Sequence, residues 1–499
     1  MFITDHLLSG IVFLPVVGAG LIVFLRNLQT VRRVTLGVTL AELALSLLLW
    51  RDFDRVIPEM QFVERVAWMP TFNIHYALGV DGISLPLVLM TAVLFPLCVL
   101  CSWRSIERNL KGFLILFLTM ETATMGVFCV LDLVLFFMFW EAMLAPMYFL
   151  IGLWGGPQRA YAAIKFVLYS LAGSLMLLIG ILGLYLAGGH SFDLVALSRV
   201  SFAPALQTWL FLAFFIAFAI KVPMFPFHTW LPDAHSEAPT AGSVILASML
   251  LKMGAYGFIR FTLPMLPDAT MAFLPLMIGL SLFAILYGGY MALAQDDLKR
   301  LIAYSSVSHM GYVTLGLFVL NVEGIEGAIL QMVNHGITTG ALFLAVGQLY
   351  DRTHSRLIQD YGGLFRPMPR YVTMLAIFSF ASFGLPGTNN FISEFLVLIG
   401  TSLRSLLITL VALGGILLAA GYMLWTIQRL ALGEMKQEEH ARLPDLNWRE
   451  MATIVPLVVL VFVIGLYPAS LLNLMHASVT HLVARLDAAQ TVTAAMFLP

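Results

Sequence analysis

Long apolar segments alternate with short polar segments along almost the whole chain of 499 residues. A helix needs about 20 predominantly apolar residues to cross the hydrocarbon core of a bilayer, and windows of that length recur throughout the sequence. We therefore predict an all-α polytopic membrane protein with about fourteen transmembrane helices. The predicted spans lie near residues 8–25, 34–50, 84–102, 112–130, 132–153, 165–187, 206–225, 240–262, 272–294, 300–320, 325–350, 371–400, 404–428 and 452–475.

The composition agrees with a protein that is surrounded by lipid. Hydrophobic residues make up 60% of the chain, charged residues 11%, and the mean hydropathy is +0.92. The 27 basic and 28 acidic residues nearly balance, which argues against a nucleic-acid partner. The three cysteines, Cys98, Cys101 and Cys129, lie in or beside apolar segments, so we interpret them as core residues. We expect no metal and no cofactor on this chain.

Basic residues in the predicted loops indicate the orientation of the chain. Lys and Arg collect on the cytoplasmic side of membrane proteins. With the N-terminus placed outside, 18 of the 27 basic residues fall in inner loops. Both termini are therefore predicted on the outer, periplasmic side. The absence of a transit-peptide pattern favours the inner (cytoplasmic) membrane of a bacterium.

Two of the predicted spans contain residues that interrupt a helix. Pro223 and Pro226 follow Lys221 in the seventh span, and Pro386 and Gly387 lie in the twelfth. Such breaks in corresponding halves are typical of inverted-repeat transporters, although ordinary proline kinks are the alternative. We predict four parts: residues 1–111 (helices 1–3), 112–262 (first inverted repeat, helices 4–8), 272–428 (second inverted repeat, helices 9–13) and 452–499 (helix 14 and tail).

Ionisable residues occur deep inside the apolar segments. A lysine at the centre of a transmembrane helix costs about 2.5–3.5 kcal/mol on insertion scales, so such residues usually have a function. Buried groups of this kind can bind and release a proton, which predicts a proton relay. The alternatives are ion pairs that only fix helix packing and histidines that are hydrogen-bonded in the core. The candidate relay residues are Glu141, Lys221, Lys252, His309, His335 and Glu394.

Other polar residues are secondary candidates. Glu121 in the fourth span is a candidate modulator of the relay, with a packing role as the alternative. Lys165 could guide protons from the cytoplasm. His228 lies with His235 in a segment whose spacing fits no standard metal site, so we interpret it as part of a loop at the inner entrance.

Several motifs resemble those of the proton-conducting antiporter family. They are PFHTWLPDAHSEAPTAGS at 226–243, LKMGAY at 251–256 and FFMFWEAMLAPMYFL at 136–150. This family includes the antiporter-like subunits of respiratory complex I (NADH:quinone oxidoreductase) and the large subunits of multi-subunit sodium/proton antiporters. Glu394, which follows LPGTNNFIS at 385–393, is similar to the subunit M family, called chain 4 in mitochondria, whereas its relatives carry lysine there.

The resemblance implies fourteen helices with two inverted five-helix repeats, and proton pumping driven by quinone reduction elsewhere in the complex. It implies that Glu141 and Lys221 form a switching pair, Lys252 is the central relay, His309 and His335 link onward, and Glu394 is the exit group. It also implies translocase activity as a subunit of the oxidoreductase, with flavin, iron–sulfur clusters and quinone on partner subunits. The expected partners are other membrane-arm subunits, especially the two related antiporter-like ones. A sodium/proton antiporter subunit and a passive membrane scaffold remain as alternatives.

Overall fold

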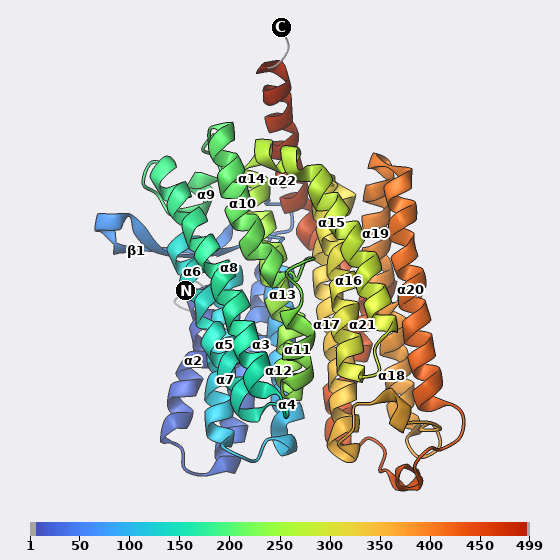
Figure 1. Cartoon of the computed structure of the whole chain (residues 1–499). Helices are drawn as coiled ribbons and strands as arrows, with labels where there is room; N and C mark the ends of the chain where they lie inside the picture. The colour runs from blue at the N-terminus through green and yellow to red at the C-terminus, as the bar shows by residue number, and fades with distance from the viewer. Residues whose placement is uncertain (1–5, 497–499) are drawn as a thin grey trace.

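The computed structural model describes residues 6–496, and long helices standing side by side make up most of it (Figure 1). The hydrophobic core extends through the whole bundle. The first half contains α2 (Leu7–Phe24), α3 (Leu28–Asp52), α4 (Leu85–Ser105), α5 (Leu110–Cys129), α6 (Leu133–Ala142), α7 (Leu144–Trp154), α8 (Arg159–Ala187), α9 (Leu194–Leu197), α10 (Pro204–Lys221), α11 (Trp230–Glu237), α12 (Thr240–Ile245), α13 (Leu251–Gly257) and α14 (Leu263–Met265). The second half contains α15 (Pro267–Leu293), α16 (Leu298–Phe318), α17 (Val322–Thr353), α18 (Pro369–Ser382), α19 (Asn389–Arg404), α20 (Leu406–Ala431), α21 (Trp448–Leu466) and α22 (Ala469–Met496).

Twelve helical segments within the described residues are long and apolar enough to cross a membrane. Helix α16 and the pair α18 and α19 occupy the other two predicted spans; α16 carries more polar residues, and neither α18 nor α19 is long enough to cross alone. The predicted all-α polytopic architecture is confirmed. The two broken helices are confirmed as well, because α10 ends at Lys221 before α11 begins at Trp230, and α18 ends at Ser382 before α19 begins at Asn389.

Glycine explains part of the second break. Gly384 has a φ of +76° and Gly387 a φ of +95°, a region of backbone space that residues with a Cβ rarely adopt. Pro386 between them has no backbone N–H to donate to a helix. The chain therefore leaves the helix at this point and resumes at Asn389.

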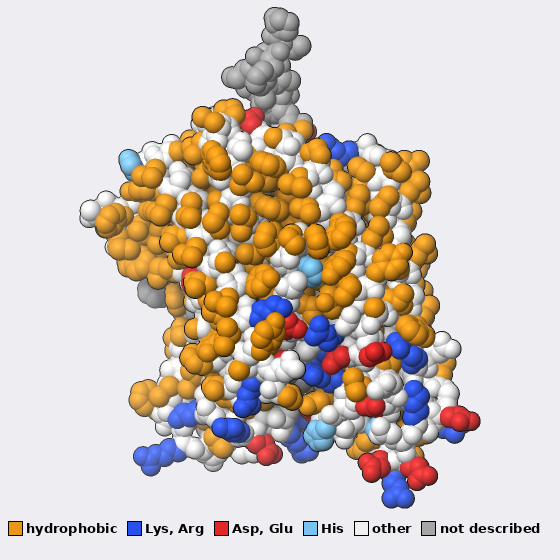
Figure 2. All heavy atoms as spheres, in the orientation of Figure 1, with side chains coloured by type: hydrophobic (Ala, Val, Ile, Leu, Met, Phe, Trp, Pro, Cys, Tyr) orange, Lys and Arg blue, Asp and Glu red, His pale blue; other side chains and the backbone are white. Residues whose placement is uncertain are grey.

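The outer faces of the helices are apolar, as lipid requires. On α8 the exposed side chains recur every three or four residues, which places them on one stripe of the helix: Ile164, Leu168, Leu171, Leu175, Ile179, Leu182 and Leu186. Figure 2 shows hydrophobic side chains over most of one face, with Lys and Arg gathered near its lower end. The charge distribution thus distinguishes one end of the molecule from the other.

The structure corrects two details of the predicted fold. A hairpin of β1 (Gln61–Met69) and β2 (Ile74–Val80), joined by the 3-10 turn Pro70–Phe72, lies between α3 and α4 and pairs Val66 with Tyr76. The predicted span 452–475 is wrong at its C-terminal side, because α21 ends at Leu466 and α22 begins at Ala469. Pro468 lies at this junction and its carbonyl accepts the first backbone hydrogen bonds of α22.

Two aspartates accept backbone hydrogen bonds close to the starts of helices. Asp132 accepts hydrogen bonds from the backbone of Val134 and Leu135 at the start of α6. Asp81 accepts backbone hydrogen bonds from Ile83 and Ser84 before α4 and also forms a buried, bidentate ion pair with Arg260. The second aspartate therefore ties the segment before α4 to the segment between α13 and α14.

Candidate functional site

Lys252 lies at the centre of the bundle with no exposed surface. It sits in α13 between two π-helical segments, Leu246–Leu250 and Phe258–Thr262, and π-bulges frequently occur at functional sites. Its Nζ donates a hydrogen bond to the carbonyl of Ala247 and lies 2.6 Å from Nδ1 of His335 on α17. A proton can pass directly between these two nitrogens.

His335 connects Lys252 to a second histidine. The rings of His335 and His309, the latter on α16, are tilted by 56° with their centroids 5.7 Å apart, and both side chains are buried. The Nε2 atom of His335 has no hydrogen-bond partner among the described residues. One side of the ring is therefore engaged by the lysine, and the other nitrogen is free to exchange a proton.

His309 is paired with Glu394 on α19. Nδ1 of His309 lies 2.9 Å from Oε1 of Glu394, and its Nε2 lies 3.3 Å from the Ser382 hydroxyl. Both members of the pair are almost fully buried, at 1% exposure each. The carboxylate also lies beside the break between α18 and α19, because a Cβ on Gly384 would approach its Oε2 to 3.3 Å. The structure thus joins Lys252, His335, His309 and Glu394, from four different helices, into one buried series.

Neutral polar side chains hold Glu394 in place, and sequence reasoning missed them. Gln331 donates to Oε1 of Glu394 over 3.0 Å and accepts a hydrogen bond from the Ser393 hydroxyl. Asn334 donates to the Asn389 carbonyl and to Ser393. Amides inside the predicted span 325–350 were the available signal, since a buried amide needs partners.

Lys221 is the last residue of α10, directly before the first helix break, and Glu141 lies on α6. Lys221 is buried, and its Nζ lies 5.2 Å from the ring centroid of Trp140 and 5.7 Å from that of Phe166. Glu141 is half-buried, and its charge acts on Lys221, yet no ion pair within 4.0 Å joins them among the residues described. The structure therefore brings the two residues near each other without direct contact.

Lys221 and Lys252 lie on helices that pack closely. Gly254 on α13 faces α10, where an added Cβ would come within 3.0 Å of the Lys221 Cβ and 2.8 Å of the Phe218 carbonyl. Glycine is therefore required for this approach of the two helices. No hydrogen bond in the described part of the chain links the two ammonium groups directly.

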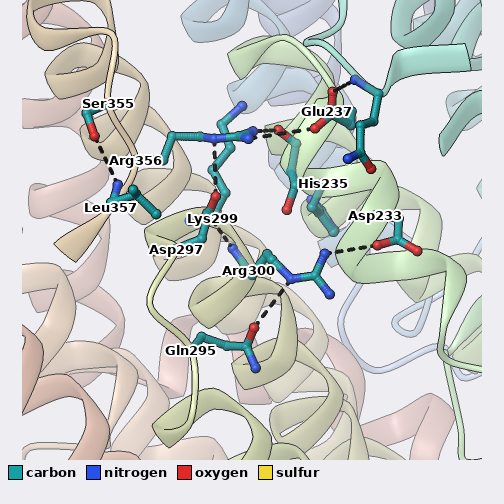
Figure 3. A network of polar contacts seen from close by, with 12 residues as sticks. Asp233, His235, Glu237, Gln295, Asp297, Lys299, Arg300, Ser355, Arg356 and Leu357 are labelled. Carbon is teal, nitrogen blue, oxygen red and sulfur yellow. Dashed lines mark hydrogen bonds and ion pairs between the residues drawn. The ribbon is translucent and has the colours of Figure 1, made fainter. Parts of the chain in front are cut away.

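Lys165 takes part in a charged cluster near α11. Lys165 on α8 forms an ion pair with Asp233 on α11 at 2.7 Å. Arg300 on α16 pairs with the same carboxylate at 3.0 Å (Figure 3). His228, just before α11, is buried and lies 3.2 Å from the Tyr287 hydroxyl through its Nε2. These contacts connect the broken seventh span to α8, α15 and α16.

A second set of contacts continues this cluster (Figure 3). Arg356 pairs with Asp297 at 3.2 Å and with Glu237 at 3.7 Å, and Lys299 donates to the Ala238 carbonyl at 2.8 Å. His235 lies in the same group, stacked on Phe343, and neither of its ring nitrogens has a hydrogen-bond partner in the described structure. This end of the bundle therefore has a high density of groups that can bind and release protons.

Glu121 does not join this series. It faces Glu42 on α3, and no described donor satisfies its oxygens. Within the described residues, no group of three or more His, Cys, Asp and Glu side chains is arranged to hold a metal ion.

Two family models together cover most of the chain. Residues 130–420 match the model described as NADH:quinone oxidoreductase/Mrp antiporter, and residues 13–131 match the amino terminus of NADH-ubiquinone oxidoreductase chain 4. Subunit M of NADH-quinone oxidoreductase from Rhodobacter capsulatus is 45% identical, over 96% of each chain. Chain 4 of NADH-ubiquinone oxidoreductase from Arabidopsis thaliana is 46% identical, over 95% of this chain and 97% of the relative.

Solved structures show the same fold. A chain of respiratory complex I from Thermus thermophilus superposes with a TM-score of 0.89 at 31% identity, covering 96% of this chain and 99% of the other. A chain of an archaeal membrane-bound sulfane sulfur reductase superposes with a TM-score of 0.85 at 22% identity, which shows similarity of fold alone.

Proposed function

The chain belongs to the NADH:quinone oxidoreductase/Mrp antiporter family, in its subunit M (chain 4) branch, and from this membership we propose how it moves protons as a membrane-arm subunit of NADH:quinone oxidoreductase. The observation that carries the proposal is the buried series of Lys252, His335, His309 and Glu394. At one end, Nζ of Lys252 lies 2.6 Å from Nδ1 of His335, and at the other end, Nδ1 of His309 lies 2.9 Å from Oε1 of Glu394.

The chemistry of the series suits transfer in steps. The Lys252 ammonium is a donor only, and a neutral His335 can accept at Nδ1 because its other proton is then on Nε2. A proton that reaches His309 is stabilised by the Glu394 carboxylate, and a hydrogen bond to a charged group contributes about 1.5–3 kcal/mol. Moving one charge across about 100 mV costs about 2.3 kcal/mol. Rearranging one such bond is therefore energetically comparable with moving one proton.

The remaining candidate residues control access to this series. Glu141 and Lys221 act as a switching pair: when Glu141 approaches, it stabilises the Lys221 ammonium, and when it withdraws, the proton can pass through water to Lys252. Lys165 and the carboxylate of Asp233 load protons from the cytoplasmic end. Glu394 releases them at the opposite end.

The surroundings of the chain follow from the same proposal. We expect its partners to be other membrane-arm subunits, including the two related antiporter-like subunits. The flavin, iron–sulfur clusters and quinone that supply the energy belong to partner subunits, and the host is the inner membrane of a bacterium. The gathering of Lys and Arg at one end supports an orientation with both termini on the outer side.

His335→Leu tests the proposal at the link between the lysine and the carboxylate. Leucine cannot carry a proton, so pumping into vesicles reconstituted with the complex should be lost while the complex still assembles. His481→Leu is the matched control, because His481 is exposed on α22. Full proton pumping by an assembled His335→Leu complex would contradict the relay and favour a passive scaffold role for this chain. Sodium movement in place of proton movement would favour a sodium/proton antiporter.

A further inference from the structure

Two buried glutamates outside the relay face each other in the N-terminal part of the bundle. Glu42 lies in the middle of α3 and Glu121 in the middle of α5, and each has 0% of its surface exposed. Helices α3 and α5 pack against each other and both pack against α4. The proposed proton route through Lys252 does not use either residue.

Neither carboxyl group has a donor among the described residues. All four carboxylate oxygens of Glu42 and Glu121 are buried without a hydrogen-bond partner when both groups are ionised. An ionised carboxylate can only accept, so two of them cannot satisfy each other. Burial of two unpaired charges of the same sign in an apolar bundle is strongly unfavourable.

A single proton resolves this arrangement. The two side chains approach closely enough for a hydrogen bond between one protonated and one ionised carboxyl group. The titratable neighbours that sense their charges are Cys98 on α4 and Cys129 at the end of α5, and no described Lys, Arg or His pairs with either glutamate. Because no described side chain supplies a counter-charge, a small cation must offset at least one of the two negative charges.

Hydroxyl groups on the same face of α3 give an independent indication of a polar site. Thr35, Thr39 and Ser46 are buried on the face that carries Glu42, at the three- and four-residue spacing of one helix face. The two threonines donate to backbone carbonyls of their own helix, whereas the Ser46 hydroxyl has no partner in the described structure. Ser46 lies one helical turn from Glu42, so an unpartnered hydroxyl and an unpartnered carboxyl group share this buried face of α3.

We propose that Glu42 and Glu121 form a second, separate proton-binding site, in which two carboxyl groups share one proton. The site lies between α3 and α5 and holds its proton independently of the relay. This proposal does not depend on the proposed relay, so it would hold even if Lys252 and His335 were shown to move no protons.

Infrared difference spectroscopy of the intact complex at neutral pH tests the proposal. The spectrum of the wild type minus that of the Glu42→Gln, Glu121→Gln double variant should contain one C=O band of a protonated carboxyl group and the bands of one carboxylate. The control is Glu59→Gln, because Glu59 is exposed and its difference spectrum should contain carboxylate bands alone. Two carboxylates and no C=O band, or two C=O bands and no carboxylate, would overturn the sharing of one proton.

A sodium titration separates the proton from the other small cation that could neutralise the pair. The proposal expects the C=O band to be unchanged when sodium is replaced by a large organic cation. Loss of the band as sodium is added would overturn it in favour of a sodium site. Glutamine has the shape of a protonated glutamate, so we expect the double variant to assemble at wild-type levels.

Discussion

Replacing Glu394 by glutamine removes one charge from the end of the relay and keeps the shape of the side chain. Glu394 accepts hydrogen bonds from His309 at 2.9 Å and from Gln331 at 3.0 Å. The Gln331 amide is fixed in orientation, because its oxygen accepts the Ser393 hydroxyl and its nitrogen must then face residue 394. A glutamine at 394 can still accept both bonds through its amide oxygen, so we expect the fold and the assembly of the complex to be retained.

The magnitude of the effect follows from the change in the His309 bond. A hydrogen bond to a charged group contributes about 1.5–3 kcal/mol, against about 0.5–1.5 kcal/mol for a neutral one. The bond between His309 and residue 394 should therefore weaken by about 1.3 kcal/mol, which is close to a tenfold change in an equilibrium constant. The amide itself cannot take up the proton. Proton release at this end should fall by at least about tenfold.

The assay compares proton pumping with quinone reduction in the same reconstituted vesicles. Glu394→Gln should lower the number of protons pumped per quinone reduced, Glu394→Asp should recover part of it because a carboxyl group is restored, and Glu434→Gln on an exposed loop should match the wild type. A wild-type proton yield from the assembled Glu394→Gln complex would refute the assignment of this residue as the exit group.

Three further predictions concern the relay and its support. Lys252→Ala should abolish proton translocation at every pH measured, whereas Lys436→Ala on an exposed loop should not, and wild-type stoichiometry in vesicles would contradict this. Gly387→Ala should destabilise the break after α18 by about 1–3 kcal/mol, because its φ of +95° strains any residue with a Cβ, and an unchanged melting temperature of the complex would count against the reasoning. Asp81→Asn should cost about 3–5 kcal/mol by leaving Arg260 buried without a counter-charge. Burial acts to raise the pKa of Asp81, but Arg260 holds that pKa below its ordinary value of 3.8. The stabilisation by this ion pair is therefore present at neutral pH and is lost only as the pH falls through the lowered pKa. Equal acid stability of the wild type and the Asp81→Asn variant would contradict this.

Hydropathy predicted the spans well because each transmembrane helix must satisfy its backbone within one continuous apolar segment. The two failures lie where that rule does not apply. The β-hairpin of residues 61–80 is short and half exposed, so its alternation is weak. Helices α21 and α22 are both partly apolar, and only Pro468 marks the boundary between them.

The candidate site was predictable as a set of residues and not as a set of contacts. His309 and Glu394 are 85 positions apart, and Lys252 and His335 are 83 apart, so no local pattern indicates their pairing. Glu42 is the only acidic residue of the predicted second span, and no local pattern marks it, because its interaction with Glu121 arises from helix packing. For its partner Glu121 the sequence predicted a modulating role in the relay or a packing role, and the modulating role stays a prediction.

The sequence by itself determined that this chain resides in a membrane, where its long apolar helical segments lie, and which ionisable groups it carries into them. Those properties depend on the cost of transferring each side chain and backbone group from water to lipid, which is a property of local sequence. Only the tertiary structure decided which groups meet. Helix packing set Lys252, His335, His309 and Glu394 in one series and set Glu42 against Glu121 elsewhere, because distances between helices depend on the side chains of the whole bundle and on close approaches such as that at Gly254.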